Sequence, residues 1–159
     1  MNSIFYKKGF RVKSHKNAFT MIEMVFVIVV LGILAGIAIP KFVATRTDAT
    51  IAKGRSDVAS IRTAISTDRQ KRFVMGSNTY IPSLDDAGNG TGETVFDGNA
   101  TTKLLTYGIT TKNSDGGWMK TGATTYTYKV AGATNTFTYN NADGTFKCTA
   151  GNYCDQLSK

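Results

Sequence analysis

Side chains that could carry catalysis are few and scattered in this chain of 159 residues, which has one His and two Cys. The His, His15, lies in a basic N-terminal stretch, and no G-x-S-x-G, P-loop or HExxH pattern occurs. Asp85 and Asp86 are adjacent, so they point to opposite sides of an extended chain, whereas an acid/base pair needs convergent groups. We therefore expect a protein that is not an enzyme.

One carboxylate stands inside the most apolar stretch of the chain. Residues 19–39 read FTMIEMVFVIVVLGILAGIAI, and Glu23 is the only charge among these 21 residues. A carboxylate costs about 2.5–3.5 kcal/mol at the centre of a bilayer, and less near its edge. Thr20 and Glu23 fit a capping box, in which each side chain satisfies a free N–H group of the first helical turn. Alternatively, Glu23 pairs with a positive charge from another subunit, such as an α-amino group exposed on Phe19. The two interpretations are compatible.

The apolar stretch predicts a membrane-spanning helix at residues 19–40. It gives a helix about 30 Å long, which matches the hydrocarbon core of a bilayer. Residues 1–18 carry five basic residues and no acidic one, and without them 14 basic and 11 acidic residues remain, a net charge of +3 instead of +8. Basic flanks stay in the cytoplasm, so residues 1–18 are expected to be a cytoplasmic leader. A secretory signal peptide is the alternative, but the apolar run is too long for one.

The start of this stretch resembles the class III signal of type IV prepilins and type II secretion pseudopilins. The resemblance covers residues 16–45 and rests on KNAFTMIE followed by MVFVIVVLGILAGIAIP. It implies that a prepilin peptidase cuts between Ala18 and Phe19 and N-methylates Phe19. It also implies that Glu23 neutralises the Phe19 amine of a neighbouring subunit during filament assembly. Gly32 and Pro40 match family positions, whereas the family usually has Gly where this chain has Ala18.

The pattern of residues 41–75 predicts that the helix continues outside the membrane. Apolar residues line one face, mostly at seven-residue spacing, and charged residues occupy the other faces. The apolar residues are Ala44, Ile51, Val58, Ile61 and Ile65. We expect this stripe to pack on the chain's own sheet; a coiled coil is the alternative, but its heptads are few and interrupted. Pro40 predicts a kink or local melting of the helix, and Gly32, Gly36 and Gly54 predict weak points.

Residues 76–159 hold 12 of the 16 Gly and are rich in Thr and Asn, a composition typical of loops and short strands. Residues 85–99 predict an irregular loop, and residues 104–107 predict a helical turn or two. Alternation predicts an antiparallel meander with strands at 125–130, 136–139 and 145–148. Its apolar face can bury the helix stripe, so the expected fold class is α+β. Trp118 is expected in this core, with ligand binding as the alternative.

Residues 76–159 contain two cysteines that could form a disulfide and four acidic residues that could bind a metal ion. Cys148 and Cys154 are separated by five residues and predict a disulfide that pins the C-terminal tail to the last strand. A zinc site is the alternative, but two Cys without a nearby His cannot complete its ligand shell. The hard oxygen ligands are Asp85, Asp86, Glu93 and Asp97. The pseudopilins that the chain resembles hold calcium near the C-terminus. Because the spacing here matches no EF-hand, we expect a solvated loop without metal or cofactor, with calcium as the alternative.

Three functions from different classes fit these expectations. The resemblance implies a structural pseudopilin of a type II secretion-type pseudopilus, and the alternative is a pilin of a type IV or competence pilus. The third, a non-polymeric single-pass membrane protein with a periplasmic binding domain, fits the Phe19 and Glu23 pattern poorly. Lysines of the C-terminal half are scattered, so no nucleic acid is expected as a partner. The expected partners are prepilin peptidase, the bacterial inner membrane and its assembly platform, copies of the chain and other pseudopilins, with residues 76–159 in the periplasm.

Overall fold

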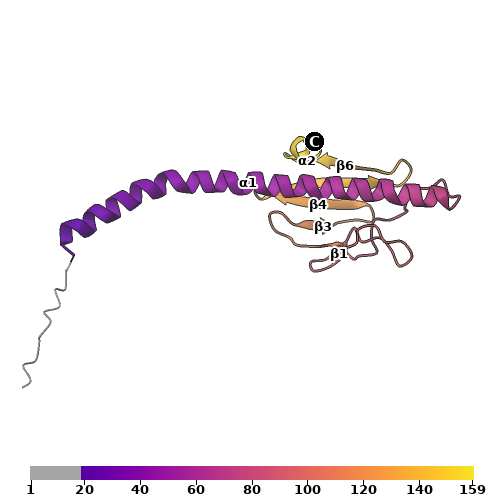
Figure 1. Ribbon diagram of the computed structural model, residues 1–159, viewed down its shortest axis with the longest axis horizontal. Helices are drawn as coiled ribbons and strands as arrows, with labels where there is room; N and C mark the ends of the chain where they lie inside the picture. The colour runs from indigo at the N-terminus through magenta and orange to yellow at the C-terminus, as the bar shows by residue number, and fades with distance from the viewer. Residues whose placement is uncertain (1–18) are drawn as a thin grey trace, which may run out of the picture. The chain divides into compact units, whose positions relative to one another are not determined.

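The computed structural model describes residues 19–159, which Figure 1 shows as a ribbon. The expected leader, with Ala18 of the expected cleavage site, lies outside the described residues. The chain divides at Pro40 into two compact units. In chain order the elements are α1 (Met21–Val74), β1 (Thr94–Val95), β2 (Ile109–Thr110), β3 (Trp118–Lys120), β4 (Thr125–Val130), β5 (Ala133–Asn140), β6 (Thr145–Ala150) and α2 (Cys154–Leu157).

The first unit contains the N-terminal part of α1. Side chains between residues 19 and 40 are exposed or half-buried, and none is buried. The helix continues without a break through Gly32 and Pro40, although Pro40 has no N–H group to donate. The local melting that the sequence predicts is therefore absent from these residues in the single chain. A kink at Gly32 and Pro40 and flexibility of this segment inside a filament stay predictions.

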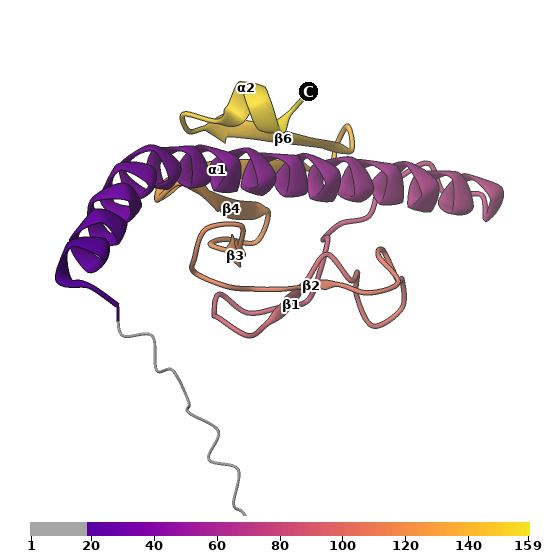
Figure 2. The same cartoon turned by 60° about the vertical axis from the view of Figure 1, so that its left-hand side comes forward.

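The second unit is a helix on a sheet. Strands β3, β4, β5 and β6 form one antiparallel sheet in that order, and β1 and β2 form a separate two-stranded sheet. Figure 2 shows the C-terminal part of α1, in magenta, running along the four-stranded sheet. This arrangement confirms the α+β fold class, with a long N-terminal helix and a small antiparallel meander.

The hydrophobic core lies between α1 and the inner face of the sheet. The helix contributes Ile51, Val58, Ile61 and Ile65, all at most 7% exposed. The prediction that this apolar stripe packs on the chain's own sheet is therefore confirmed. Every second residue of β4 and β5 is buried, which is the alternation expected of a sheet with one face in the core.

Trp118 is a core residue. Its side chain is fully buried, and its ring lies 5.3 Å from Phe96 and 5.1 Å from Phe137, centroid to centroid. The indole N–H donates to Asp57 Oδ2 on α1 at 3.0 Å. A buried Trp whose N–H group has a partner packs without an unsatisfied donor, so Trp118 joins helix and sheet.

Four local predictions are wrong. Residues 94–95, inside the stretch expected to be an irregular loop, form strand β1. Ala44 is exposed, so the buried stripe of α1 begins at Ile51. Residues 104–107 form no helical turn, although Leu104 and Leu105 pack against the core. The sheet has a fourth strand, β3, whose three residues are too short for alternation to be recognised in the sequence.

Gly54 is a close-packing position rather than a weak point of α1. A Cβ atom built there would lie 2.7 Å from Leu157 Cδ2 and closer still to the ring of Tyr128. Glycine therefore lets α2 and β4 approach the helix backbone, which no larger residue would permit without displacement.

Candidate functional site

The lone acid of the apolar segment lies at the start of α1. Phe19 precedes the helix and is 73% exposed, and Glu23 occupies the first turn. The Glu23 backbone N–H donates to Thr20 Oγ1 at 3.3 Å, which is one half of the predicted capping box. Among residues 19–159, no hydrogen bond or ion pair engages the Glu23 carboxylate. This carboxylate is therefore accessible to a positive charge from another chain.

The surface around Glu23 is apolar over several helical turns. Exposed large apolar side chains run from Phe19 to Val43, with exposed fractions from 44% at Val27 to 87% at Met21. In the described part of the chain, α1 is the one helix long and apolar enough to cross a membrane. Such a surface needs a bilayer or other protein chains to cover it.

A known motif covers this segment. Residues 13–39 match the family model of the prokaryotic N-terminal methylation motif. The chain carries a prepilin-type methylation motif. The match includes Phe19 and Glu23 and supports a protein of the type IV pilin-like class, which is structural rather than enzymatic. No solved structure matches the chain.

The motif implies processing by prepilin peptidase and assembly into filaments. An apolar N-terminal helix is compatible with the single-pass membrane anchor of such a protein. Cleavage between Ala18 and Phe19, methylation of Phe19 and the pairing of Glu23 stay predictions.

The acidic loop places Asp85 in the core rather than in an open metal site. The buried side chain accepts hydrogen bonds from Lys120 Nζ at 2.7 Å and from the Tyr126 hydroxyl at 2.8 Å. The backbone N–H groups of Ala87 and Phe96 also donate to it, at 3.1 and 3.2 Å. Burial, reinforced by the Asp85 charge, raises the pKa of the Tyr126 hydroxyl well above its usual range. Asp85 therefore fastens the loop to β3 and β4, and its oxygens are occupied.

The other three expected ligands, Asp86, Glu93 and Asp97, line an open depression of about 440 Å³. Lys103 lines the same depression, and one Asp86 oxygen accepts the Ala100 N–H at 3.1 Å. Within residues 19–159, no group of three or more His, Cys, Asp or Glu side chains is arranged to hold a metal ion. Calcium prefers six to eight oxygen ligands, so this donor set does not fit it. That the protein needs no cofactor stays a prediction.

A disulfide and two hydrogen bonds from α1 hold the C-terminal residues in place. Cys148 on β6 and Cys154 at the start of α2 form the expected disulfide, with Cα atoms 5.3 Å apart. Arg62 on α1 donates to the carbonyl oxygens of Phe146 and Ser158 at 3.0 and 3.2 Å. The sequence does not predict these contacts, because a charged residue on a helix face carries no sign of the carbonyl groups that it meets.

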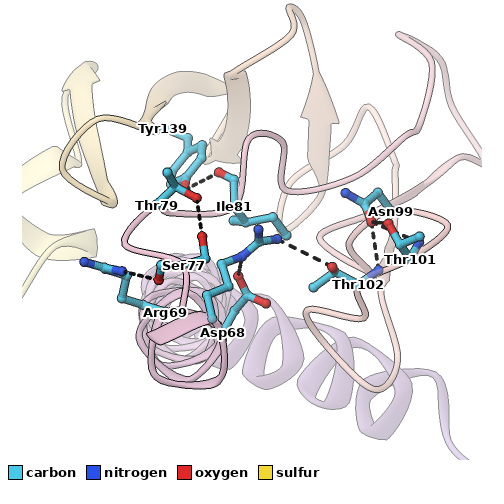
Figure 3. A network of polar contacts seen from close by, with 10 residues as sticks. Asp68, Arg69, Ser77, Thr79, Ile81, Asn99, Thr101, Thr102 and Tyr139 are labelled. Carbon is cyan, nitrogen blue, oxygen red and sulfur yellow. Dashed lines mark hydrogen bonds and ion pairs between the residues drawn. The ribbon is translucent and has the colours of Figure 1, made fainter. Parts of the chain in front are cut away.

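Polar contacts also join the last turns of α1 to the loops, as Figure 3 shows. Arg72 Nε donates to Asp68 Oδ2 at 2.6 Å, and Arg72 Nη2 donates to Thr102 Oγ1 at 3.5 Å. Asp68 is only 4% exposed, so this ion pair is partly shielded from water. Arg72 thereby ties residues 99–102 to the helix.

Proposed function

We propose that this pilin-like protein is a structural subunit of a type II secretion-type pseudopilus, processed by prepilin peptidase and assembled into a helical filament. The observation that supports it most directly is the exposed apolar helix of residues 19–40 with its single carboxylate, in the same chain as a small helix-and-sheet domain. Such a helix needs a bilayer before assembly and neighbouring apolar helices afterwards.

Cleavage before Phe19 supplies the charge that Glu23 lacks. It removes the five basic residues of the leader and creates one α-amino group on Phe19. In an assembled filament, Glu23 of one copy pairs with the Phe19 amine of a neighbouring copy. An unpaired carboxylate is costly in apolar surroundings, and opposite charges attract more strongly there than in water. The pair therefore favours one register between adjacent subunits.

The proposal places the subunit in the inner membrane of a bacterium before assembly. Basic residues of the leader hold the N-terminus in the cytoplasm, so residues 41–159 lie in the periplasm. The disulfide between Cys148 and Cys154 supports this location, because disulfides persist in oxidising compartments. The partners are prepilin peptidase, the membrane assembly platform, other copies of the chain and other pseudopilins.

A pilin of a type IV or competence pilus is the alternative. We favour the pseudopilus because the domain is small and its lysines are spread over separate elements, whereas a surface for DNA gathers basic and aromatic side chains. Deletion of the gene distinguishes the two. Loss of protein secretion supports the pseudopilus, and loss of surface pili or DNA uptake supports the alternative.

The central test is Glu23→Ala in the full chain. We expect this variant to be processed and inserted into the membrane but to form no filaments in electron microscopy, since the charge that pairs with Phe19 is gone. Glu93→Ala removes an exposed carboxylate from the domain and is the matched control, which should assemble normally. Mass spectrometry of the parent protein should give a mature N-terminus of methyl-Phe19. Normal filaments from Glu23→Ala, or retention of residues 1–18, would contradict the proposal.

A further inference from the structure

A loop of the C-terminal domain carries an acceptor sequence for N-linked glycosylation. The triplet Asn99-Ala100-Thr101 fits the N-x-S/T pattern, and Asp97 adds a carboxylate two residues before the asparagine. We propose that the Asn99 side-chain nitrogen is modified by an oligosaccharide transferred from a lipid-linked donor.

Figure 3 shows the side-chain oxygen of Asn99 hydrogen-bonded to Thr101 and Thr102. Asn99 Oδ1 accepts hydrogen bonds from the Thr101 hydroxyl at 3.0 Å, the Thr101 N–H at 3.1 Å and the Thr102 N–H at 2.8 Å. Among residues 19–159, no hydrogen bond involves Asn99 Nδ2, and the one buried side-chain polar atom without a partner is Ser114 Oγ. Asn99 Nδ2 therefore reaches solvent.

The loop is held at its base and open at its tip. The backbone N–H of Asn99 donates to the Thr102 carbonyl at 2.9 Å, and the Thr102 N–H donates back to the Asn99 carbonyl at 3.2 Å. Arg72 holds the Thr102 side chain from α1. At the tip, Ala100 and Thr101 are exposed, and Asp97 lines the open depression beside them. An enzyme can therefore reach the acceptor from the solvent side.

A second triplet, Asn89-Gly90-Thr91, provides an internal comparison. Asn89 is exposed and Asn99 is half-buried, so exposure alone would favour Asn89. However, the residue two positions before Asn89 is Ala87, whereas Asp97 can pair with a cationic side chain of a transferase. The charge of Asp97 is therefore the feature that selects Asn99.

The reaction is a substitution at the anomeric carbon of the first sugar. A bond forms between Asn99 Nδ2 and this carbon, while the bond from the carbon to the pyrophosphate oxygen of the lipid carrier breaks. One Asn99 amide proton passes to a base of the transferase, the lipid pyrophosphate leaves, and no atom is oxidised or reduced. Because the reaction requires the loop on the side of the membrane where the glycan is presented, the inference rests on the proposed periplasmic location of the domain.

The test is peptide mapping of the full chain, expressed in a bacterium that makes a lipid-linked oligosaccharide and its transferase. Trypsin releases residues 73–103 as one peptide that contains both Asn89 and Asn99, since no Lys or Arg lies between Arg72 and Lys103. We expect this peptide to carry one glycan, which fragmentation locates at Asn99.

Matched variants separate the acceptor sequence from the fold of the loop. Asn99→Gln, Thr101→Ala and Asp97→Asn should each remove the added mass. Thr101→Ser keeps the hydroxyl and Asn89→Gln leaves the proposed acceptor untouched, so both should retain the full mass.

Three results would be decisive. An unmodified peptide in a chain whose N-terminus is methyl-Phe19 would overturn the inference and leave the proposed function standing. A glycan at Asn89 alone, or one that persists in Asp97→Asn, would overturn the selection by Asp97. A glycan at Asn99 in a chain that keeps residues 1–18 would support the inference and contradict the proposed function.

Discussion

The ion pair between Asp85 and Lys120 is a buried polar contact of the acidic loop, and its removal should be costly. The Asp85 side chain is 0% exposed and the Lys120 side chain 8% exposed. Asp85→Asn keeps the shape of the side chain but removes its charge. Lys120 Nζ then retains the Ala87 carbonyl at 2.8 Å as a neutral partner. Leaving one charge of a buried pair uncompensated costs about 3–5 kcal/mol.

That loss is a substantial fraction of the stability of a typical domain, which is about 5–15 kcal/mol. The double variant Asp85→Asn/Lys120→Met removes both charges, so it should recover part of the loss. Replacing a complete buried ion pair with apolar groups is often neutral in free energy, whereas breaking one is not. The order of stability should therefore be parent, double variant, Asp85→Asn.

The free energy of unfolding can be measured in urea on the full chain in detergent, with fluorescence of Trp118 as the probe. Trp118 is the one Trp of the chain and is fully buried, so its emission reports loss of the core. Asp86→Asn is the matched control, because Asp86 is exposed and adjacent; it should change stability by about 1 kcal/mol or less. Equal stability of Asp85→Asn and Asp86→Asn would refute the reasoning.

Three further outcomes are expected. Gly54→Ala should destabilise the domain by about 1–3 kcal/mol in the same urea assay, because its Cβ overlaps Tyr128 and Leu157, whereas Gly88→Ala, which has no neighbour within 4 Å, should be nearly neutral. Burial raises the pKa of Tyr139 to about 12. The contribution of its neutral hydroxyl to the free energy of unfolding is therefore complete below pH 10 and is lost as pH rises towards 12. Because tyrosine ionises at a lower pH in the unfolded chain, the free energy of unfolding falls by up to about 1.4 kcal/mol per pH unit per tyrosine. In urea titrations at alkaline pH, this fall should be shallower for Tyr139→Phe than for the parent. Calcium should leave the thermal midpoint unchanged relative to a chelator; a midpoint that rises with calcium concentration would favour a calcium site instead.

Much of the fold could be predicted because its patterns repeat along the chain. Ile51, Val58 and Ile65 recur every seven residues on α1, and Tyr126 and Tyr128 alternate on β4, so each element shows its buried face several times. Strand β3 has only three residues and shows its pattern once. Gly54 could not be recognised as a packing position either, because the side chains that approach it come from distant parts of the chain.

The N-terminal motif could be recognised because its chemistry is local in sequence. A single carboxylate four residues after Phe19, within an otherwise apolar run, is visible without any structure. The role of Asp85, in contrast, depends mostly on residues that are distant in the sequence. Its donors lie 2, 11, 35 and 41 residues further along the chain. Asp85 and Asp86 are chemically identical neighbours, so only the fold determines which one enters the core.

Asp85 and Glu23 pose the same electrostatic problem and receive different solutions. Each is a carboxylate among apolar side chains, where an uncompensated charge is unfavourable. Asp85 finds its cation, Lys120, within its own domain, so its replacement should alter domain stability without altering processing. Glu23 has no cationic partner among residues 19–159, and under the proposed function a neighbouring chain supplies one. Replacing Glu23 should therefore leave the unfolding curve of the domain unchanged and abolish assembly. A Glu23→Ala variant with a destabilised domain would mean that Glu23 acts within its own chain.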